Sequence, residues 1–204
     1  MIRSNESINI MRIDYQPGME QDDHVLDFIE KLQNHNIKYV VTSGFIETSM
    51  EQNRIKSDVE ILIRNVTFEK FLKFWLELEK TYECLDTDDP IDAYNGYLRN
   101  HHAIRIRKLE VNALNFILRF VKNDLDRALL KYRKYATLKD KKIYVSSLEI
   151  MIPYKLSMGS GKDIEDAISL FERFKDELNT ELLEKFLKEL EIPEESANKY
   201  LGKL

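Results

Sequence analysis

Two carboxylates in a short apolar segment are the side chains whose types and spacing most clearly suggest chemistry. Asp58 and Glu60 alternate with apolar residues in the run DVEILI, residues 58–63. Successive side chains of an extended strand point to opposite faces, so the two acids should share one face while Val59 and Ile61 enter a core. Carboxylates that close repel each other unless a cation or a shared proton lies between them. A divalent metal ion is the simplest such cation.

A plainer explanation of the same pattern remains open. Alternation alone would place Asp58 and Glu60 on the solvated face of an amphipathic strand. The D-x-E pattern is short and often occurs by chance. The choice between a metal site and a solvated strand face therefore depends on the residues that precede this strand.

A turn of small residues precedes the acidic strand. The apolar residues 39–41 run into Ser43 and Gly44, and Ser57 comes directly before Asp58. Backbone N–H groups exposed at a glycine turn that leads into a helix can hold phosphate. This order of a strand, a Ser-Gly turn, a spacer and an S-D-x-E strand resembles the entry to the nucleotidyltransferase fold of the polymerase-β-like superfamily.

The resemblance implies a nucleotide site with a bound metal ion. In that superfamily the Gly/Ser turn holds the nucleotide phosphates, so Ser43, Gly44 and Ser57 would bind NTP. The acidic pair holds metal, so Asp58 and Glu60 would bind Mg²⁺ or Mn²⁺. Mg²⁺ commonly takes one or two carboxylates together with phosphates and water. Two features depart from the usual pattern, because the superfamily usually has Gly-Ser or Gly-Gly and D-x-D where this chain has Ser-Gly and D-x-E.

The second half of the chain carries a further resemblance. Residues 126–171 look like the nucleotidyltransferases of the AbiEii toxin type and their minimal relatives. The shared features are a short strand, a helix with a lysine on its buried side, a glycine-containing break and a Lys-Asp-x-x-Asp helix, here at 143–145, Lys155, 159–161 and 162–166. The resemblance implies a toxin-like enzyme with an antitoxin partner.

Lys155 is notable from its position alone. Leu148, Met151, Ile152 and Leu156 form one stripe of a helix, and Lys155 lies within this stripe. A lysine there needs a counter-ion or must extend to solvent. A nucleotide phosphate and an acid of the metal cluster are both candidate counter-ions. The alternative is a lysine at the end of the apolar face that reaches solvent.

The residues after the glycine break are partly explained by helix structure. The spacing Ser160-x-x-Asp163 resembles a capping box, and acidic residues are favourable in the first turn of a helix. This explanation covers Asp163 but not Lys162, which lies at the unfavourable end of the helix dipole. We therefore interpret Lys162 as a candidate phosphate contact, and Asp163 and Asp166 as orienting or structural residues.

A third carboxylate, usually from a neighbouring central strand, would complete a polymerase-like metal site. The candidate is Glu110, near the end of the segment 104–112. Ile104, Ile106 and Glu110 share one parity, but Lys108 interrupts it, so the assignment needs a bulge or a strand break. In that position Glu110 would bind metal or act as the general base for the incoming hydroxyl.

Length and composition predict an ordinary globular protein. The chain has 204 residues, of which 43% are apolar, and a single cysteine, Cys84. It has no apolar run long enough to span a membrane and no signal-peptide pattern. One cysteine cannot form an internal disulfide, so these features together favour the cytoplasm and predict no membrane partner.

Charge is distributed unevenly along the chain. The net charge is −5, yet residues 119–142 hold nine Lys or Arg against three Asp, and residues 163–204 hold six Lys or Arg against twelve Asp or Glu. The basic segment also carries Tyr132 and Tyr135, so it could bind the phosphates of a nucleotide or of an RNA end. The alternative is a solvated helix over 125–135 whose cations pair with the acidic C-terminal helices.

Hydrophobic periodicity predicts an α/β core followed by a helical region. The expected helices lie at 20–35, directly after Gly44, at 67–81 and at 123–134, and the expected strands lie at 38–42, 58–63, 103–111 and 142–145. Residues 147–203 are typical of four helices. The predicted fold class is α/β (α+β), with a nucleotidyltransferase-like mixed sheet and flanking helices over residues 1–145 and a C-terminal helical layer, residues 146–204, packed on this core.

The favoured function is metal-dependent transfer of a nucleoside monophosphate from NTP to a hydroxyl group of tRNA, a protein or a small molecule. Lys155 and Lys162 would neutralise charge on the triphosphate. The alternative is a catalytically degenerate module that binds nucleotide or protein, as Glu60 and the inverted order of Ser43 and Gly44 suggest. A third option is an RNA-binding protein that uses residues 119–142.

Overall fold

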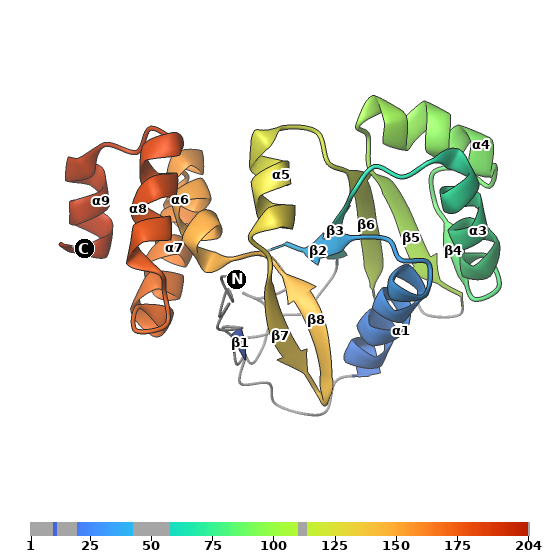
Figure 1. The fold of residues 1–204 in the computed structure, drawn as a ribbon, viewed down its shortest axis with the longest axis horizontal. Helices are drawn as coiled ribbons and strands as arrows, with labels where there is room; N and C mark the ends of the chain where they lie inside the picture. The colour runs from blue at the N-terminus through green and yellow to red at the C-terminus, as the bar shows by residue number, and fades with distance from the viewer. Residues whose placement is uncertain (1–9, 12–19, 43–57, 110–113, 204) are drawn as a thin grey trace, which may run out of the picture. The chain divides into compact units, whose positions relative to one another are not determined.

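The protein is represented by a computed structural model that describes residues 10–11, 20–42, 58–109 and 114–203. The chain divides into two compact units, residues 1–145 and 146–204. Figure 1 shows a sheet with helices in the first unit and helices in the second. No helix in the described part of the chain is both long enough and apolar enough to cross a membrane.

The described part of the first unit contains one sheet of eight strands. Their order across the sheet is β1-β7-β8-β2-β3-β6-β5-β4. β3 pairs with β6 in parallel and with β2 antiparallel, so the sheet is mixed, as predicted. The bounds are β1 Ile10–Met11, β2 Tyr39–Val41, β3 Asp58–Ile63, β4 Tyr82–Cys84, β5 Ile104–Lys108, β6 Asn115–Phe120, β7 Lys134–Leu138 and β8 Lys141–Val145.

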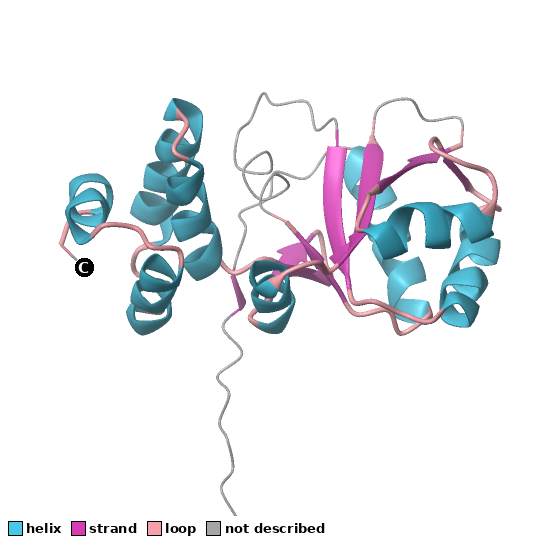
Figure 2. Cartoon of the chain, turned by 90° about the horizontal axis from the view of Figure 1, so that it is seen from above, coloured by secondary structure: helices cyan, strands magenta, loops and turns pink. Residues whose placement is uncertain are grey.

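Helices accompany the sheet in the first unit and make up the described secondary structure of the second, as the colours of Figure 2 show. In the first unit they are α1 Glu20–Asn34, α3 Phe68–Leu78, the short α4 Pro90–Asp92, the π-helical η1 Ala93–Tyr97, the 3-10 helix η2 Leu98–Asn100 and α5 Asp124–Lys131. In the second unit they are α6 Leu148–Met158, α7 Gly161–Phe174, α8 Thr180–Glu189 and α9 Glu194–Leu201.

The core of the first unit forms because alternate positions of β3 and β6 are apolar. These positions lie in register and are fully buried; they are Val59, Ile61, Ile63, Phe116, Leu118 and Phe120. The ring of Phe28 on α1 stacks on that of Phe116 with centroids 4.2 Å apart. α1 in turn packs against α3, whose buried face carries Phe71 and Phe74. The other positions of β3, which include Asp58 and Glu60, therefore face away from this core.

The second unit is organised around α6. This helix is buried on almost all sides because α7 and α8 both pack against it. It ends at Gly159, whose φ of 72° places it in the left-handed region that favours glycine. Ser160 then caps α7 by accepting a hydrogen bond from the backbone N–H of Asp163, which confirms the predicted cap.

Most predicted helices and strands are present in the structure, and the differences involve both strands and helices. The predicted helix over 123–134 is wrong at its C-terminal end, because α5 ends at Lys131 and β7 begins at Lys134, paired with β8. The alternative of a solvated helix over 125–135 is wrong for the same reason. The strands β1, β4 and β6 and the short helical segments α4, η1 and η2 were not predicted. The short helix expected after Gly44 lies outside the described residues.

Candidate functional site

Asp58 and Glu60 lie together on one exposed face of β3. Both side chains are exposed, whereas the intervening Val59 is fully buried. The predicted alternation of these three residues is therefore confirmed. Each carboxylate has one side-chain hydrogen-bond partner among the described residues, and both partners are electrically neutral.

Asn115 on β6 binds Asp58. The parallel pairing of β3 with β6 places Asn115 directly opposite Asp58, and the Asn115 amide nitrogen donates to the Asp58 carboxylate across 2.9 Å. An amide orients a carboxylate without neutralising its charge. Asp58 is thereby held in place and keeps its capacity to bind a cation.

Thr42 holds Glu60 from the other neighbouring strand. The backbone N–H of Thr42 donates to the Glu60 carbonyl at 3.0 Å, which continues the antiparallel ladder past the end of β2. The Thr42 hydroxyl donates to the Glu60 carboxylate at 3.1 Å. Thr42 is buried, so its hydroxyl has little freedom to move. The two acids are thus oriented by strands on both sides of β3.

The predicted third carboxylate, Glu110, lies outside the described residues. The segment that was expected to carry it ends as β5 at Lys108, and β5 pairs with β6 rather than with β3. The strand beside Asp58 presents Asn115 instead. Sequence reasoning missed this residue because β6 was not predicted, although the run NFILRF has the same form as DVEILI, with a polar residue ahead of alternating apolar ones.

The donor set fits a hard divalent cation. Two exposed carboxylates on one strand match the one or two that Mg²⁺ commonly takes from protein, with phosphates and water supplying the remaining oxygens. Within the described ranges no group of three or more His, Cys, Asp or Glu residues is placed to hold a metal ion. Among the described residues, Asp58 and Glu60 are the two that would hold such an ion.

The residues predicted to bind the triphosphate are only partly described. Ser43, Gly44 and Ser57 lie outside the described residues. Lys162, in the first turn of α7, is exposed. Lys155 is buried, as its place in the apolar stripe of α6 predicted.

The counter-ion of Lys155 is a carboxylate of the same unit. Its ammonium nitrogen lies 3.0 Å from an Asp166 oxygen and 3.8 Å from an Asp163 oxygen. These contacts join α6 to α7. From the sequence we expected a nucleotide phosphate or an acid of the metal cluster as the counter-ion of Lys155. The structure shows Asp166 in this role. The interpretation of Asp163 and Asp166 as structural or orienting residues agrees with these contacts.

A second buried charge in this unit was not foreseen from the sequence. Glu149 is completely buried, and its carboxylate accepts hydrogen bonds from the Ser147 hydroxyl at 2.5 Å and from the Asn179 backbone N–H at 2.9 Å. Hydrogen bonds from Ser147 and Asn179 link the start of α6 to the start of α8. Such a buried and bonded carboxylate is a structural feature of the helical unit.

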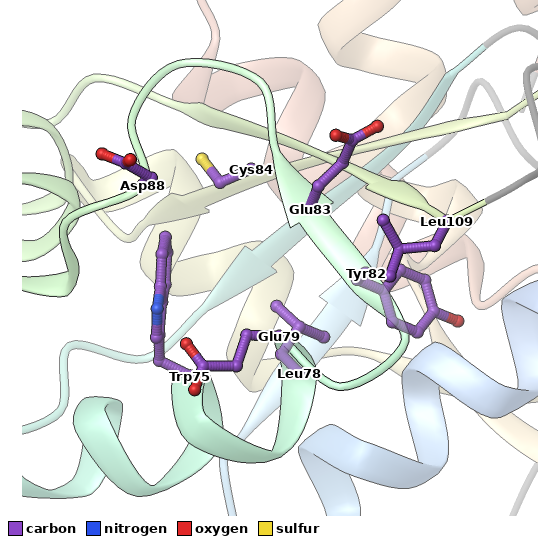
Figure 3. Close-up of a pocket in the computed structure, with 8 residues that line it drawn as sticks. All are labelled: Trp75, Leu78, Glu79, Tyr82, Glu83, Cys84, Asp88 and Leu109. Atoms are coloured by element: carbon purple, nitrogen blue, oxygen red, sulfur yellow. The ribbon is translucent and has the colours of Figure 1, made fainter.

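A pocket of about 310 Å³ lies at the C-terminal end of α3, and its lining does not include Asp58 or Glu60. Figure 3 shows its lining from α3, β4 and the two loops that follow β4 and β5. Three carboxylates, Glu79, Glu83 and Asp88, line it. Burial raises the pKa of the Cys84 thiol, which keeps it protonated near neutral pH. This acidic lining does not suit a triphosphate.

The known structures that resemble this chain share its fold. No family model matches the sequence, and no curated protein matches it. An antigenic nucleotidyltransferase-like protein from Paracoccidioides brasiliensis has 20% sequence identity and a TM-score of 0.54, with 89% of this chain and 92% of that chain covered. ANT(2'')-Ia in complex with adenylyl-2''-tobramycin has 10% identity and a TM-score of 0.53, with 85% and 98% covered.

A solution structure of the antibiotic-resistance factor ANT(2'')-Ia agrees, with 9% identity, a TM-score of 0.51 and coverage of 84% of this chain and 91% of that chain. Each of these matches extends over both units of the chain, and together with the mixed sheet that carries Asp58 and Glu60 they identify the architecture. The chain has the nucleotidyltransferase fold.

Proposed function

We propose that this protein is a metal-dependent nucleotidyltransferase that transfers a nucleoside monophosphate from NTP to a hydroxyl acceptor. The observation that carries the proposal is the exposed pair of Asp58 and Glu60 on one face of β3, held by Asn115 and Thr42 within a nucleotidyltransferase fold. Neutral partners leave both negative charges available for a cation that accompanies the triphosphate.

In the proposed reaction the acceptor oxygen forms a bond to the α-phosphorus, the bond to pyrophosphate breaks, and the hydroxyl proton passes to a base. A Mg²⁺ or Mn²⁺ ion bound by Asp58 and Glu60 would supply positive charge to the triphosphate. Glu110 is the proposed base. Asn115 and Thr42 keep the two carboxylates in position, which lowers the reorganisation needed when substrate binds.

The remaining roles rest on the resemblance to known nucleotidyltransferases. Ser43, Gly44 and Ser57 are the proposed phosphate-binding residues of the turn, and Lys155 and Lys162 are proposed to neutralise triphosphate charge. The Asp166 contact supports a structural role for Lys155 as well. A toxin-like role with an antitoxin partner and a cytoplasmic location are proposals of the same kind.

We propose the chemical class of the acceptor rather than a particular molecule. ANT(2'')-Ia was solved with adenylyl-2''-tobramycin, a nucleotide joined to a small hydroxylated molecule. This supports small hydroxylated molecules as acceptors to test first, followed by tRNA and protein hydroxyls.

A catalytically degenerate nucleotide-binding module is the second candidate. One observation favours it: the position beside Asp58 on β6 carries the neutral Asn115 rather than an acid. A site with two carboxylates can bind one metal ion with a nucleotide and still lack the charge to hold a second ion at which an acceptor is activated. This candidate predicts binding of NTP without turnover.

Calorimetry of NTP binding with and without Mg²⁺ tests the proposal. We expect binding that requires Mg²⁺ and that is lost in Asp58→Asn/Glu60→Gln. The matched control is Glu79→Gln/Asp88→Asn, which removes the same charge from two exposed acids of the acidic pocket and should bind NTP like the native chain.

Transfer of labelled NMP to a panel of acceptors then separates the two candidates. Metal-dependent transfer supports the enzyme. Binding without transfer to any acceptor supports the degenerate module, and the absence of NTP binding in the native chain would overturn both.

A further inference from the structure

The first unit has a depression of about 460 Å³ with a basic lining. Four exposed cations contribute to it from three separate segments: Lys38 before β2, Arg64 after β3, and Arg127 and Lys131 on α5. Asn65, Val121 and Leu130 complete the lining, which contains no carboxylate. We call these residues the basic depression.

The basic depression lies at the opposite end of β3 from the carboxylate pair. Arg64 follows the last residue of β3, whereas Asp58 is its first residue. Lys38 is next to Arg64 because the Arg64 backbone N–H donates to the Lys38 carbonyl at 2.8 Å. Arg64 is six residues from Asp58 and four from Glu60, which at a rise of about 3.3 Å per residue corresponds to roughly 20 and 13 Å along the strand.

The positive charges of the depression are poorly compensated. Lys38 and Arg64 have no ion-pair partner in the part of the chain that the structure describes. Partial burial, together with the charges of Arg133 and Arg64, lowers the pKa of Lys38. Cations of like charge that crowd together in this way are stabilised by an external anion.

The cations on α5 can also reach a ligand. Arg127 binds Asp124 at 2.5 Å, but both side chains are well exposed, and such a surface pair contributes little free energy. The Lys131 ammonium lies 4.8 Å from the centroid of the Tyr132 ring, which places an aromatic ring beside the basic depression. Cations next to an aromatic ring are typical of surfaces that bind single-stranded nucleic acids.

We propose that the basic depression binds a single-stranded nucleic acid through its phosphates, independently of the carboxylate pair. The open shape and the exposed, flexible cations from several segments suit an extended chain of phosphates. A small phosphate compound is instead typically held by convergent donors in a closed site. The inference goes beyond the proposed nucleotide transfer, because this surface would bind nucleic acid whether or not the protein is a transferase.

Fluorescence anisotropy with a labelled single-stranded RNA of about 20 nucleotides, measured over a series of KCl concentrations, tests the proposal. We expect Lys38→Gln/Arg64→Gln to weaken binding by about tenfold or more. The slope of log affinity against log salt should fall by about 1.4, or about 0.7 for each RNA phosphate that the variant no longer neutralises. Arg127→Gln/Lys131→Gln, on a different element, should act in the same direction.

The matched control is Lys80→Gln/Arg99→Gln, which removes two positive charges from exposed residues of the same unit. Binding unchanged in the control and in Asp58→Asn supports a local site that is separate from the carboxylates. Three results would overturn the proposal: no RNA binding by the native chain, equal losses in the control and in the depression variants, or displacement of RNA by low concentrations of inorganic phosphate or ATP, which would assign the depression to a small phosphate ligand.

Discussion

The carboxylates of Asp58 and Glu60 differ from the carboxylate of Asp126, in the same unit, in the groups that donate hydrogen bonds to them. Asp58 and Glu60 are exposed and accept hydrogen bonds from the neutral side chains of Asn115 and Thr42. Asp126 is buried and binds the Arg119 guanidinium through two contacts, at 2.6 and 3.0 Å, and the Lys122 backbone N–H at 2.9 Å.

The difference separates charge that stabilises the fold from charge that can bind a ligand. Burial alone would raise the pKa of Asp126, but the hydrogen bonds from Arg119 and the Lys122 backbone hold it below its usual value. Its negative charge is therefore satisfied within the protein. Asp58 and Glu60 are oriented by neutral groups, so their charges remain available to a metal ion.

The largest expected effect is on activity at Asp58. If the proposed transfer occurs, Asp58→Asn should lower its rate by about 10³-fold, since it removes a metal ligand at the reacting phosphate. The melting temperature should change by no more than about 1 °C because the side chain is exposed. Initial rates and thermal melts measure the two effects. The control is Asp124→Asn, at a carboxylate that is 96% exposed, which should change neither the rate nor the melting temperature. A fully active Asp58→Asn enzyme would contradict the proposal that Asp58 binds the metal ion.

Asp126 should show the opposite behaviour. Asp126→Asn leaves Arg119 without its carboxylate partner in a partly buried position, so we expect the free energy of unfolding to fall by about 3 kcal/mol. Urea unfolding measures it. Asp124→Asn, in the same helix, should cost less than about 0.5 kcal/mol. An equal loss of unfolding free energy in Asp126→Asn and Asp124→Asn would contradict the conclusion that Asp126 stabilises the fold.

The stabilisation from Asp126 should depend on pH. Its pKa is lower in the folded protein than the ordinary value of about 3.9, so the unfolded chain takes up the proton first as the pH falls. The contribution is therefore fully present above that ordinary value and is lost as the pH falls through the lowered pKa. The difference in unfolding free energy between the native chain and Asp126→Asn should be constant near neutral pH and should shrink below about pH 4. A difference that grows on acidification would have the wrong sign.

In the helical unit, Lys155 forms ion pairs that should also stabilise the fold. Lys155→Met removes the cation that faces Asp166 and Asp163, and we expect it to destabilise the protein by about 2 kcal/mol, less than full burial would give because both acids keep some exposure. The control is Lys162→Met, which changes an exposed lysine in the next helix and should have little effect on urea unfolding. If Lys155→Met is neutral, its ion pairs contribute nothing to the stability of the fold.

The smallest effect should come from Asn115→Asp. A third acid beside Asp58 removes the hydrogen-bond donor and adds like charge, so stability without metal should fall by about 1 kcal/mol. Mg²⁺ should restore more stability to this variant than to the native chain, because a third carboxylate strengthens the site. Melting curves over a Mg²⁺ titration measure the difference. An Asn115→Ala variant, which also lacks the donor, should show no such metal effect.

Sequence periodicity predicted the residues whose partners are local. The alternation in 58–63 placed Asp58 and Glu60 on one face, and the Ser160 cap and the buried position of Lys155 follow from the helical repeat. These features depend on neighbours a few positions away, which is the range that periodicity detects.

The partners of those residues could not be predicted in the same way. The hydrogen bond between Asn115 and Asp58 depends on β6 lying beside β3, and the ion pair between Lys155 and Asp166 depends on how α6 and α7 pack. The residues of β7, KYATL, include a helix-favouring start, and pairing with β8 makes them a strand. Packing between separate elements decided each of these outcomes, across 57 positions for Asn115 and Asp58 and between consecutive elements for the other two.

The parallel pairing of β3 with β6 has a consequence for how the protein folds. It joins Asp58 to Asn115, which are 57 positions apart, and contacts of such long range form slowly because a large loop must close first. A chain whose helices have formed but whose β6 has not docked still lacks the bond that orients Asp58. The ability to bind metal should therefore appear late in refolding, after most of the helical signal has been recovered.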